Sequence, residues 1–128
     1  MEVRFTVIAG TAQQQEVCVK KKRIYLGRLA EVVDANQRLT RQNDVAFRDD
    51  GPAPNPSVSR AHAHLEFDSE KAVFRLFDDR SAQGTAVIRD GSVIPVPQGP
   101  SKGVALRNGD EIVLGQARLR FEEGKAFK

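Results

Sequence analysis

The sequence predicts an all-β protein, an antiparallel β-sandwich of about ten to eleven short strands. Apolar and polar residues alternate in many short segments, and this period of two is typical of strands buried on one face. Glycine, asparagine and aspartate residues that favour turns separate these segments. Many short strands joined by tight turns favour a sandwich, so we expect a binding site in the loops at one of its ends.

The expected strands follow one another along the chain, and each is defined by its apolar positions. Asp90-Gly91 is a tight-turn pair between two of them, and Asn108-Gly109 and Gly115-Gln116 mark further turns. In order, the apolar positions are Val3/Phe5/Val7, Val17/Val19, Ile24/Leu26, Val45–Phe47, Ala63/Leu65/Phe67, Phe74/Leu76, Val87-Ile88, Val93-Ile94, Ile112/Leu114 and Leu119/Phe121.

Two irregular segments lie between Arg28 and Ser59. The segment Leu29–Gln42 has only a weak apolar stripe, and we predict a long loop there with at most one helical turn. The segment Asp49–Ser57 contains three prolines and a glycine, so it cannot form a central strand. Both segments are therefore expected to run over the surface, where the functional loops of a sandwich are found.

Length and composition favour one domain spanning 1–128. The single cysteine, Cys18, excludes an internal disulfide and favours a reducing, cytoplasmic location, and we expect its side chain to be half-buried and structural. No apolar stretch reaches the roughly 18–20 residues that a membrane-spanning helix needs. The first residues also lack the pattern of a secretion signal. The sequence therefore predicts no membrane partner.

Four short segments carry the residues of interest. Gly27-Arg28 closes the third expected strand, and Ser59-Arg60-Ala61-His62 opens the fifth. The segment 76–85 has the pattern Leu-x-Asp-x-x-Ser-Ala-Gln-Gly-Thr, and 106–115 has the pattern Leu-x-x-Gly-Asp-x-Ile-x-Leu-Gly. Each segment alone is ordinary, since a glycine and an arginine at a strand end usually form a turn and a solvated charge. Their order and spacing together are specific.

With these segments in this order, the chain resembles the forkhead-associated (FHA) domain, a β-sandwich of the SMAD/FHA type that binds phosphothreonine peptides. The resemblance covers about residues 24–121, and Asn43-Asp44-Val45 and Ser59–Ala63 are its most specific parts. It implies that Arg28 binds the phosphate and that Ser59 donates a hydrogen bond to a phosphate oxygen. Arg60 is expected to help hold the phosphate or the peptide main chain.

The resemblance also implies supporting roles and shows departures. Gly27, His62 and Gly84 are expected to support the site, with His62 bracing the loop from inside. Gln83 stands where the family has an asparagine that holds the peptide main chain, so the amide is kept on a longer side chain. Ala82 stands where the family often has a hydroxyl, so that contact to the phosphate is lost.

The connection that follows Arg28 is longer than the family usually has. Because it must pass near the binding end, we expect either that Arg38 or Arg41 adds peptide contacts or that the loop partly covers the site.

Elementary electrostatics favours the same assignment. A phosphothreonine carries roughly −1.5 to −2 charge near neutral pH. A binder therefore needs cationic donors, and the planar fork of arginine suits this task. Such a site binds and releases without chemistry, with an affinity on the order of micromolar. We accordingly predict no enzyme activity and no cofactor, and a phosphorylated partner that is a Ser/Thr kinase or its substrate.

An enzymatic alternative rests on the two histidines. His62, His64 and Glu66 alternate on one expected strand face, an arrangement that can bind a divalent metal. The favoured interpretation is that one histidine supports a loop and the other lies on a solvated face, so no metal site is predicted. Asp49-Asp50 and Asp78-Asp79 are interpreted as turn and surface residues.

Two further alternatives stay open. The run Lys20–Arg23, within a chain of formal net charge +3, would suit nucleic-acid binding, but aromatic residues for base stacking are few and no nucleic-acid partner is predicted. The other alternative keeps the fold, because the changes at Ala82 and Gln83 suit a domain that binds an unmodified protein surface.

Overall fold

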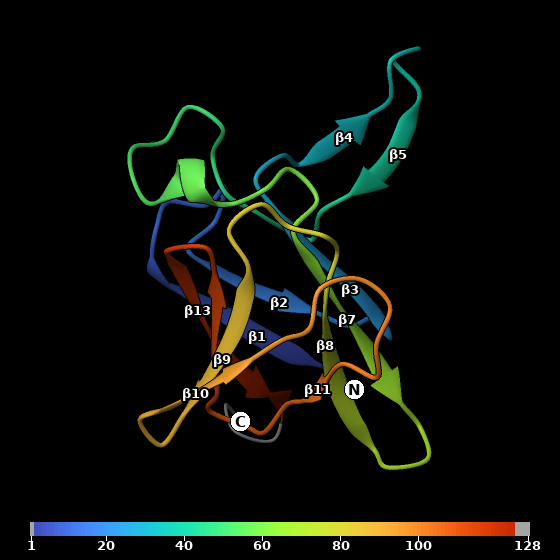
Figure 1. The fold of residues 1–128 in the computed structure, drawn as a ribbon, viewed down its shortest axis with the longest axis vertical. Coiled ribbons are helices and arrows are strands. Elements are labelled where there is room, and N and C mark those ends of the chain that lie inside the picture. The colour runs from blue at the N-terminus through green and yellow to red at the C-terminus, as the bar shows by residue number, and fades with distance from the viewer. Residues whose placement is uncertain (1, 125–128) are drawn as a thin grey trace.

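The computed structural model describes residues 2–124 and confirms the all-β prediction (Figure 1). The elements, from the N-terminus, are β1 (Val3–Ala9), β2 (Glu16–Val19), β3 (Arg23–Gly27), β4 (Glu31–Val33), β5 (Leu39–Gln42), β6 (Val45–Ala46), the 3₁₀ turn η1 (Asn55–Ser57), β7 (Ala63–Asp68), β8 (Val73–Asp78), β9 (Thr85–Arg89), β10 (Ser92–Pro95), β11 (Val104–Ala105), β12 (Glu111–Leu114) and β13 (Ala117–Glu123). Each of the ten expected segments forms a strand, and β4, β5 and β11 are additional.

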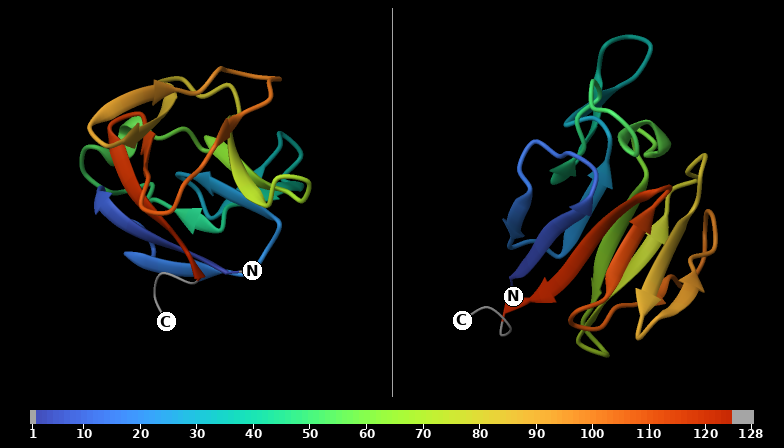
Figure 2. Two further views of the ribbon diagram at one scale, coloured as in Figure 1. Left: turned by 90° about the horizontal axis from the view of Figure 1, so that it is seen from below. Right: turned by 90° about the vertical axis from the view of Figure 1, so that its left-hand side faces the viewer.

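Two sheets form the layers of the sandwich. The first has the order β10-β9-β12-β13-β1-β2, and the second has the order β11-β8-β7-β3-β6. Within residues 2–124, every pair of named strands is antiparallel except β3 with β6, where Leu26 lies opposite Val45. Figure 2 shows the two layers from two further directions. No helix in this part of the chain is long and apolar enough to cross a membrane.

Apolar side chains of the two sheets fill the space between them. In β13 the side chains of Ala117, Leu119 and Phe121 are buried. Arg118 and Arg120, which alternate with them, are exposed. The Phe121 ring lies 6.0 Å from the ring of Phe5 on β1, in the same sheet, and 6.1 Å from the ring of Phe74 on β8, in the opposite sheet. Alternation along each strand thus produces a common core.

The segment Leu29–Gln42 is not the loop that we predicted. It contains a two-stranded hairpin, β4 with β5, which extends beyond the body of the sandwich (Figure 1). The turn forms because the Asp34 carboxylate accepts hydrogen bonds from the main-chain N–H groups of Asn36 and Arg38, at 2.8 and 3.0 Å. Most hairpin side chains are exposed, so no apolar alternation marked its strands in the sequence.

The expectation for Cys18 was also wrong, because its side chain is exposed rather than half-buried. Cys18 lies on β2, which is the edge strand of the six-stranded sheet, opposite Arg4 of β1. At this position of the strand the side chain points to the solvent face, whereas the next residue, Val19, points into the core.

The irregular segments meet at one end of the sandwich. The loop after β3, the segment before β7 and the turn between β8 and β9 come together there. Two hydrogen bonds show the meeting directly: the Arg28 N–H donates to the Ser59 carbonyl at 3.0 Å, and the Ala82 N–H donates to Ser59 Oγ at 3.0 Å. This end is where the site residues expected from the sequence lie.

Candidate functional site

Arg28 is anchored by its main chain and by one edge of its side chain. Its Nε donates to the Val58 carbonyl at 2.8 Å, and its Nη1 contacts the carboxylate of Asp49. No acceptor within residues 2–124 is at hydrogen-bond distance from the other terminal nitrogen, and 24% of the side chain is exposed. A held guanidinium with a free donor can bind an anion without first losing much side-chain entropy.

Ser59 offers a hydroxyl hydrogen to the same end of the domain. Its Oγ accepts the hydrogen bond from the Ala82 N–H. Because that bond occupies a lone pair of the oxygen, the hydroxyl hydrogen points elsewhere and can be donated. The same contact ties the segment before β7 to the turn that carries Ala82.

His62 is fully buried and braces two loops at once. Its Nδ1 accepts a hydrogen bond from the Ser59 N–H at 2.9 Å, and its Nε2 lies 2.9 Å from the Gly84 carbonyl. A main-chain N–H can only donate and a carbonyl can only accept, so the neutral ring carries its hydrogen on Nε2. Both partners belong to the candidate site, and His62 therefore holds Ser59 and Gly84 at a defined separation.

Burial lowers the pKa of the His62 imidazole below its ordinary value of 6.5, and the opposing effects of Gly84, Asp78 and Asp79 are smaller. We therefore expect the free energy of unfolding to decrease as the pH falls through 6.5 toward the folded-state pKa. In that window the unfolded chain binds a proton that the folded domain excludes, whereas above it His62 is neutral in both states. Denaturant unfolding across this range measures the slope.

A second experiment, an NMR titration of the folded domain, follows the assigned ¹⁵N signals of both imidazole rings and so distinguishes His62 from His64. A His62 ring that titrates at or above pH 6.5 in the folded domain would contradict the expectation.

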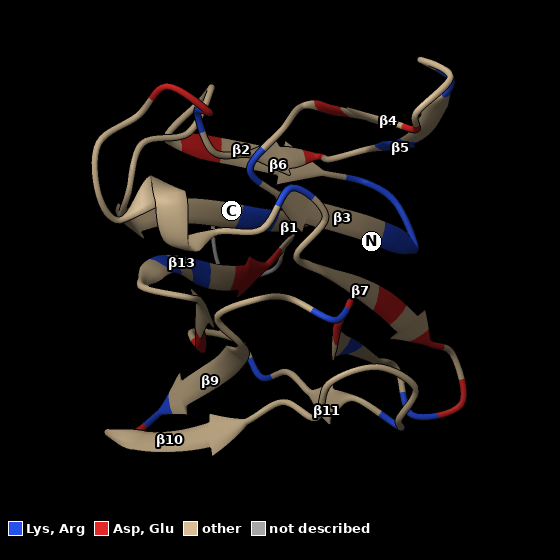
Figure 3. Ribbon diagram, turned by 45° about the horizontal axis from the view of Figure 1, so that its top comes forward, with Lys and Arg blue, Asp and Glu red and all other residues tan. Residues whose placement is uncertain are grey.

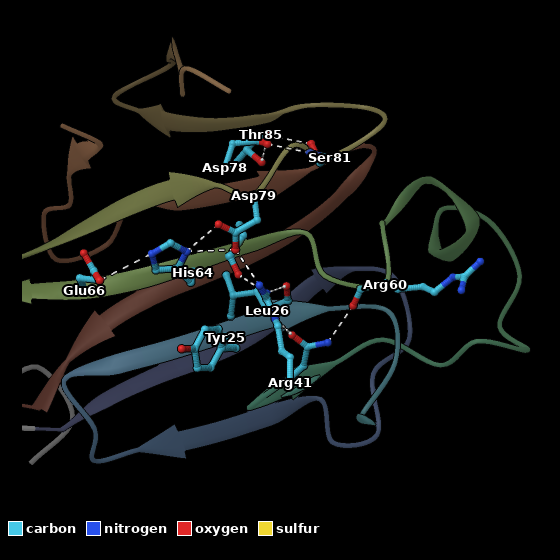
Figure 4. A network of polar contacts seen from close by, with 12 residues as sticks. Tyr25, Leu26, Arg41, Arg60, His64, Glu66, Asp78, Asp79, Ser81 and Thr85 are labelled. Carbon is cyan, nitrogen blue, oxygen red and sulfur yellow. Dashed lines mark hydrogen bonds and ion pairs between the residues drawn. The ribbon is translucent and has the colours of Figure 1, made fainter. Parts of the chain in front are cut away.

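The turn between β8 and β9 is built on a buried carboxylate. Asp78 accepts hydrogen bonds from the Ser81 N–H at 2.8 Å, from Ser81 Oγ at 2.7 Å and from Thr85 Oγ1 at 2.7 Å (Figure 4). The interpretation of Asp78 as a turn residue is therefore confirmed, but its interpretation as a surface residue was wrong, since its side chain is buried. The turn presents Ala82 and Gln83 to solvent.

Arg41 is not available for peptide contacts, contrary to one of the two expectations for the long connection. Its guanidinium donates to Asp79 at 2.7 Å and to the carbonyls of Leu26 and Ala63 at 2.9 and 2.6 Å. It also lies 4.7 Å from the centre of the Tyr25 ring. Arg41 thus joins the hairpin to β3 and β7, while the side chain of Arg38 is exposed.

Asp79 completes this network rather than lying free on the surface. Burial alone would raise the pKa of its carboxyl group, but hydrogen bonds from His64 and Arg41 outweigh burial, so the pKa is lowered. The His64 ring lies 2.8 Å from Asp79 through Nδ1 and stacks on Phe77 with ring centroids 5.0 Å apart. Figure 4 shows Arg41, Asp79 and His64 next to one another, and His64 lies on the face of β7 opposite to the buried Ala63 and Leu65.

Asn43 and Gly27 hold the segment that carries Arg60. The Asn43 amide donates to the Leu29 and Arg60 carbonyls at 2.5 and 2.8 Å, and its oxygen accepts from Arg41 at 2.9 Å. A side chain at position 27 would overlap the Arg60 carbonyl, so glycine is required for this approach. The Arg60 side chain itself extends into solvent (Figure 4).

The structure thus brings together Arg28, Ser59 and Ala82, with Gln83 next along the turn. Arg60 joins them through its main chain only. Sequence reasoning did not recognise Asp78, Arg41 and Asn43 as the residues that position these groups. The pattern Asp78-x-x-Ser81 is a signal for a side-chain-capped turn and would have indicated the first of them.

The histidines do not form a shared site. Among residues 2–124, no group of three or more His, Cys, Asp or Glu side chains is placed to hold a metal ion. His62 faces the core, where it binds two main-chain groups, and the His64 ring binds Asp79 on the outer face.

Three of the four basic side chains in the run Lys20–Arg23, which suggested nucleic-acid binding, form ion pairs with acidic side chains. Figure 3 shows Lys and Arg segments interspersed with Asp and Glu segments over both sheets. The ion pairs of the run are Lys20 with Glu2 at 3.7 Å, Lys21 with Asp44 at 2.5 Å, and Arg23 with Glu66. A continuous cationic surface for phosphate backbones is therefore not formed by these side chains.

The fold is that of the FHA-type β-sandwiches. The chain is similar to the kinase-interacting FHA domain of an Arabidopsis kinase-associated protein phosphatase, with a TM-score of 0.67 and 24% identity over 94% of this chain and 92% of that one. It is also similar to the FHA domain of an Arabidopsis thaliana hypothetical protein, with a TM-score of 0.63 and 21% identity over 94% and 84% of the two chains.

A third similar structure is Mycobacterium tuberculosis EmbR in complex with a low-affinity phosphopeptide, with a TM-score of 0.59, 21% identity, and coverage of 94% of this chain and 24% of that one. Residues 24–115 match the family model of the FHA domain, so the chain belongs to the FHA domain family. No curated protein sequence matches it significantly.

Proposed function

We propose that residues 1–128 form one FHA domain that binds a phosphothreonine segment of a partner protein and releases it without chemical change. The observation that carries this proposal is the pairing of an anchored, partly free Arg28 guanidinium with a Ser59 hydroxyl at the end of the sandwich. A phosphate has several acceptor oxygens, and these two donors reach it from different segments.

Each residue of the proposed site has a distinct task. Arg28 supplies charge and the N–H groups of its free terminal nitrogen, and Ser59 supplies a neutral donor. The exposed Gln83 amide is suited to hydrogen bonds with the main chain of the bound peptide, and the exposed side chain of Arg60 offers a second cation. Ala82 has no hydroxyl to donate, so the site has one phosphate contact fewer than a serine or threonine would allow.

Related structures support the choice of ligand and partner. A similar FHA structure, with a TM-score of 0.56 and 21% identity, is described in terms of phosphothreonine-dependent interactions. The FHA domain of the kinase-associated protein phosphatase is described as kinase-interacting. We therefore propose a Ser/Thr kinase or its substrate as the partner, in a reducing, intracellular compartment that suits the free Cys18.

A titration with two matched peptide libraries tests the proposal. Both are degenerate around a central threonine, phosphorylated in one library and unmodified in the other. We expect binding on the order of micromolar for the phosphorylated library and at least tenfold weaker binding for the other. A phosphoserine library shows whether threonine is preferred.

The second candidate function is binding of an unmodified protein surface, which the missing hydroxyl at Ala82 favours. Equal affinity for the two libraries would support this candidate and would rule out phosphate recognition.

A further inference from the structure

The phosphate-binding arginine of the proposed site already contacts an anion of the same chain. The Asp49 carboxylate binds Nη1 of Arg28 from the proline-containing segment, and 60% of the Asp49 side chain is exposed. A phosphate that approaches the free side of this guanidinium comes within a few ångströms of that carboxylate. Like charges at such a separation repel one another, and the repulsion is strongest when water is excluded.

The contact belongs to a well-braced turn. The Arg48 N–H donates to the Thr11 carbonyl at 2.8 Å, and the Gly51 N–H donates back to the Arg48 carbonyl at 3.1 Å. The buried Asn55 side chain binds both main-chain groups of Thr11 and also the Arg48 carbonyl, at 2.8 to 2.9 Å. The main chain on both sides of Asp49 is therefore held in place, which keeps this residue next to Arg28 in the structure.

The charges around the site are unbalanced once a phosphate is bound. Arg28 and Asp49 together carry no net charge, whereas the phosphate brings roughly −1.5 to −2. The neighbouring Arg48 and Asp50 form an ion pair with each other and so contribute little net charge. The complex retains an excess of negative charge, located where Asp49 and the phosphate share Arg28.

We propose that Asp49 is a specificity-determining residue of this site, which selects partners that carry a lysine or arginine close to the phosphothreonine. A cation of the partner at that place pairs with Asp49 and removes the repulsion between the carboxylate and the phosphate. A partner without such a cation binds with lower affinity, because the repulsion between the carboxylate and the phosphate remains. The inference rests on the proposed phosphopeptide function and names the chemistry of its partner.

Binding of scanned peptides to two variants tests this proposal. The peptides contain phosphothreonine and carry lysine or glutamine at each flanking position in turn. For at least one position we expect the parent domain to prefer lysine by about three- to fivefold. Asp49→Asn should lose this preference and bind the glutamine peptides about three- to tenfold more tightly than the parent, because the competing charge is gone.

Asp50→Asn is the matched control, since Asp50 is the adjacent exposed aspartate and pairs with Arg48 instead of Arg28. We expect it to keep the lysine preference of the parent. If Asp49→Asn keeps that preference, or if it binds the glutamine peptides no more tightly, the selective role of Asp49 is overturned while phosphopeptide binding stands. If the parent binds phosphorylated and unmodified peptides equally, both the function and this inference fail.

Discussion

Replacing Arg28 with alanine is expected to weaken phosphothreonine-peptide binding by at least tenfold, the largest effect on affinity of any single substitution in the site. Removing one partner of a desolvated charge pair typically costs about 2–5 kcal/mol. In this domain the loss includes the free terminal nitrogen and the charge itself, and it leaves the Asp49 carboxylate facing the phosphate without a cation. Isothermal titration calorimetry with a phosphopeptide measures the change.

Three comparisons define what an Arg28→Ala result means. Arg28→Lys keeps the charge but loses the planar fork and the Nε bond to Val58, so we expect an intermediate loss of affinity. Ser59→Ala removes one neutral donor and should cost about 1–2 kcal/mol. Arg107→Ala alters an exposed arginine next to the Asn108-Gly109 turn, at the end of β12 opposite the site, and should leave binding unchanged.

The fold must remain intact for this test, because the Arg28 side chain also binds the Val58 carbonyl. Thermal unfolding of each variant provides that check. If a folded Arg28→Ala domain binds the phosphopeptide as tightly as the parent, the proposed site is wrong.

Replacing Asp78 with alanine is expected to lower the free energy of unfolding by at least about 3 kcal/mol, the largest effect on stability. The buried carboxylate accepts three hydrogen bonds, and its removal leaves two hydroxyls and one main-chain N–H without their acceptor. Because the same turn presents the Ala82 N–H to Ser59, the remaining folded domain should also bind phosphopeptide more weakly. Denaturant unfolding measures the stability.

Thr85→Val serves as the graded control for Asp78→Ala. It removes one of the three donors and keeps the shape of the side chain, so we expect a cost of about 1–2 kcal/mol. Equal, small effects of the two substitutions would show that the carboxylate does not organise the turn.

The contrast between β7 and the β4–β5 hairpin explains what the sequence pattern could predict. Ala63 and Leu65 alternate with polar residues because one face of β7 lies on the core, and this alternation is visible in the sequence. The hairpin is stabilised by its turn at Asp34 and by Arg41, while both of its faces are largely open to solvent. Without a buried face it leaves no periodic signal.

In the candidate site, too, the local sequence indicated some residues and not others. Arg28 and Ser59 stand out through short local patterns at strand ends, and the resemblance to the FHA family suggested their tasks. Nothing in the local sequence indicates that Asp49 contacts Arg28, since the two residues are 21 positions apart and β4, β5 and β6 lie between them along the chain. Arg41 looked equally free, although its guanidinium is enclosed by Asp79, two carbonyls and the Tyr25 ring.

The amino-acid sequence was sufficient to predict the all-β class and the positions of ten strands, and it supplied the candidate residues for phosphate binding. These are properties of neighbouring residues, because burial of one strand face imposes an alternation that can be read locally. The three-dimensional structure was needed to show that Arg41 is enclosed whereas Arg28 keeps one terminal nitrogen without a partner among residues 2–124, that Cys18 faces solvent, and that Asp49 contacts the Arg28 guanidinium. Those outcomes depend on contacts between segments that are far apart along the chain, and only the pairing and packing of the strands fixes these contacts.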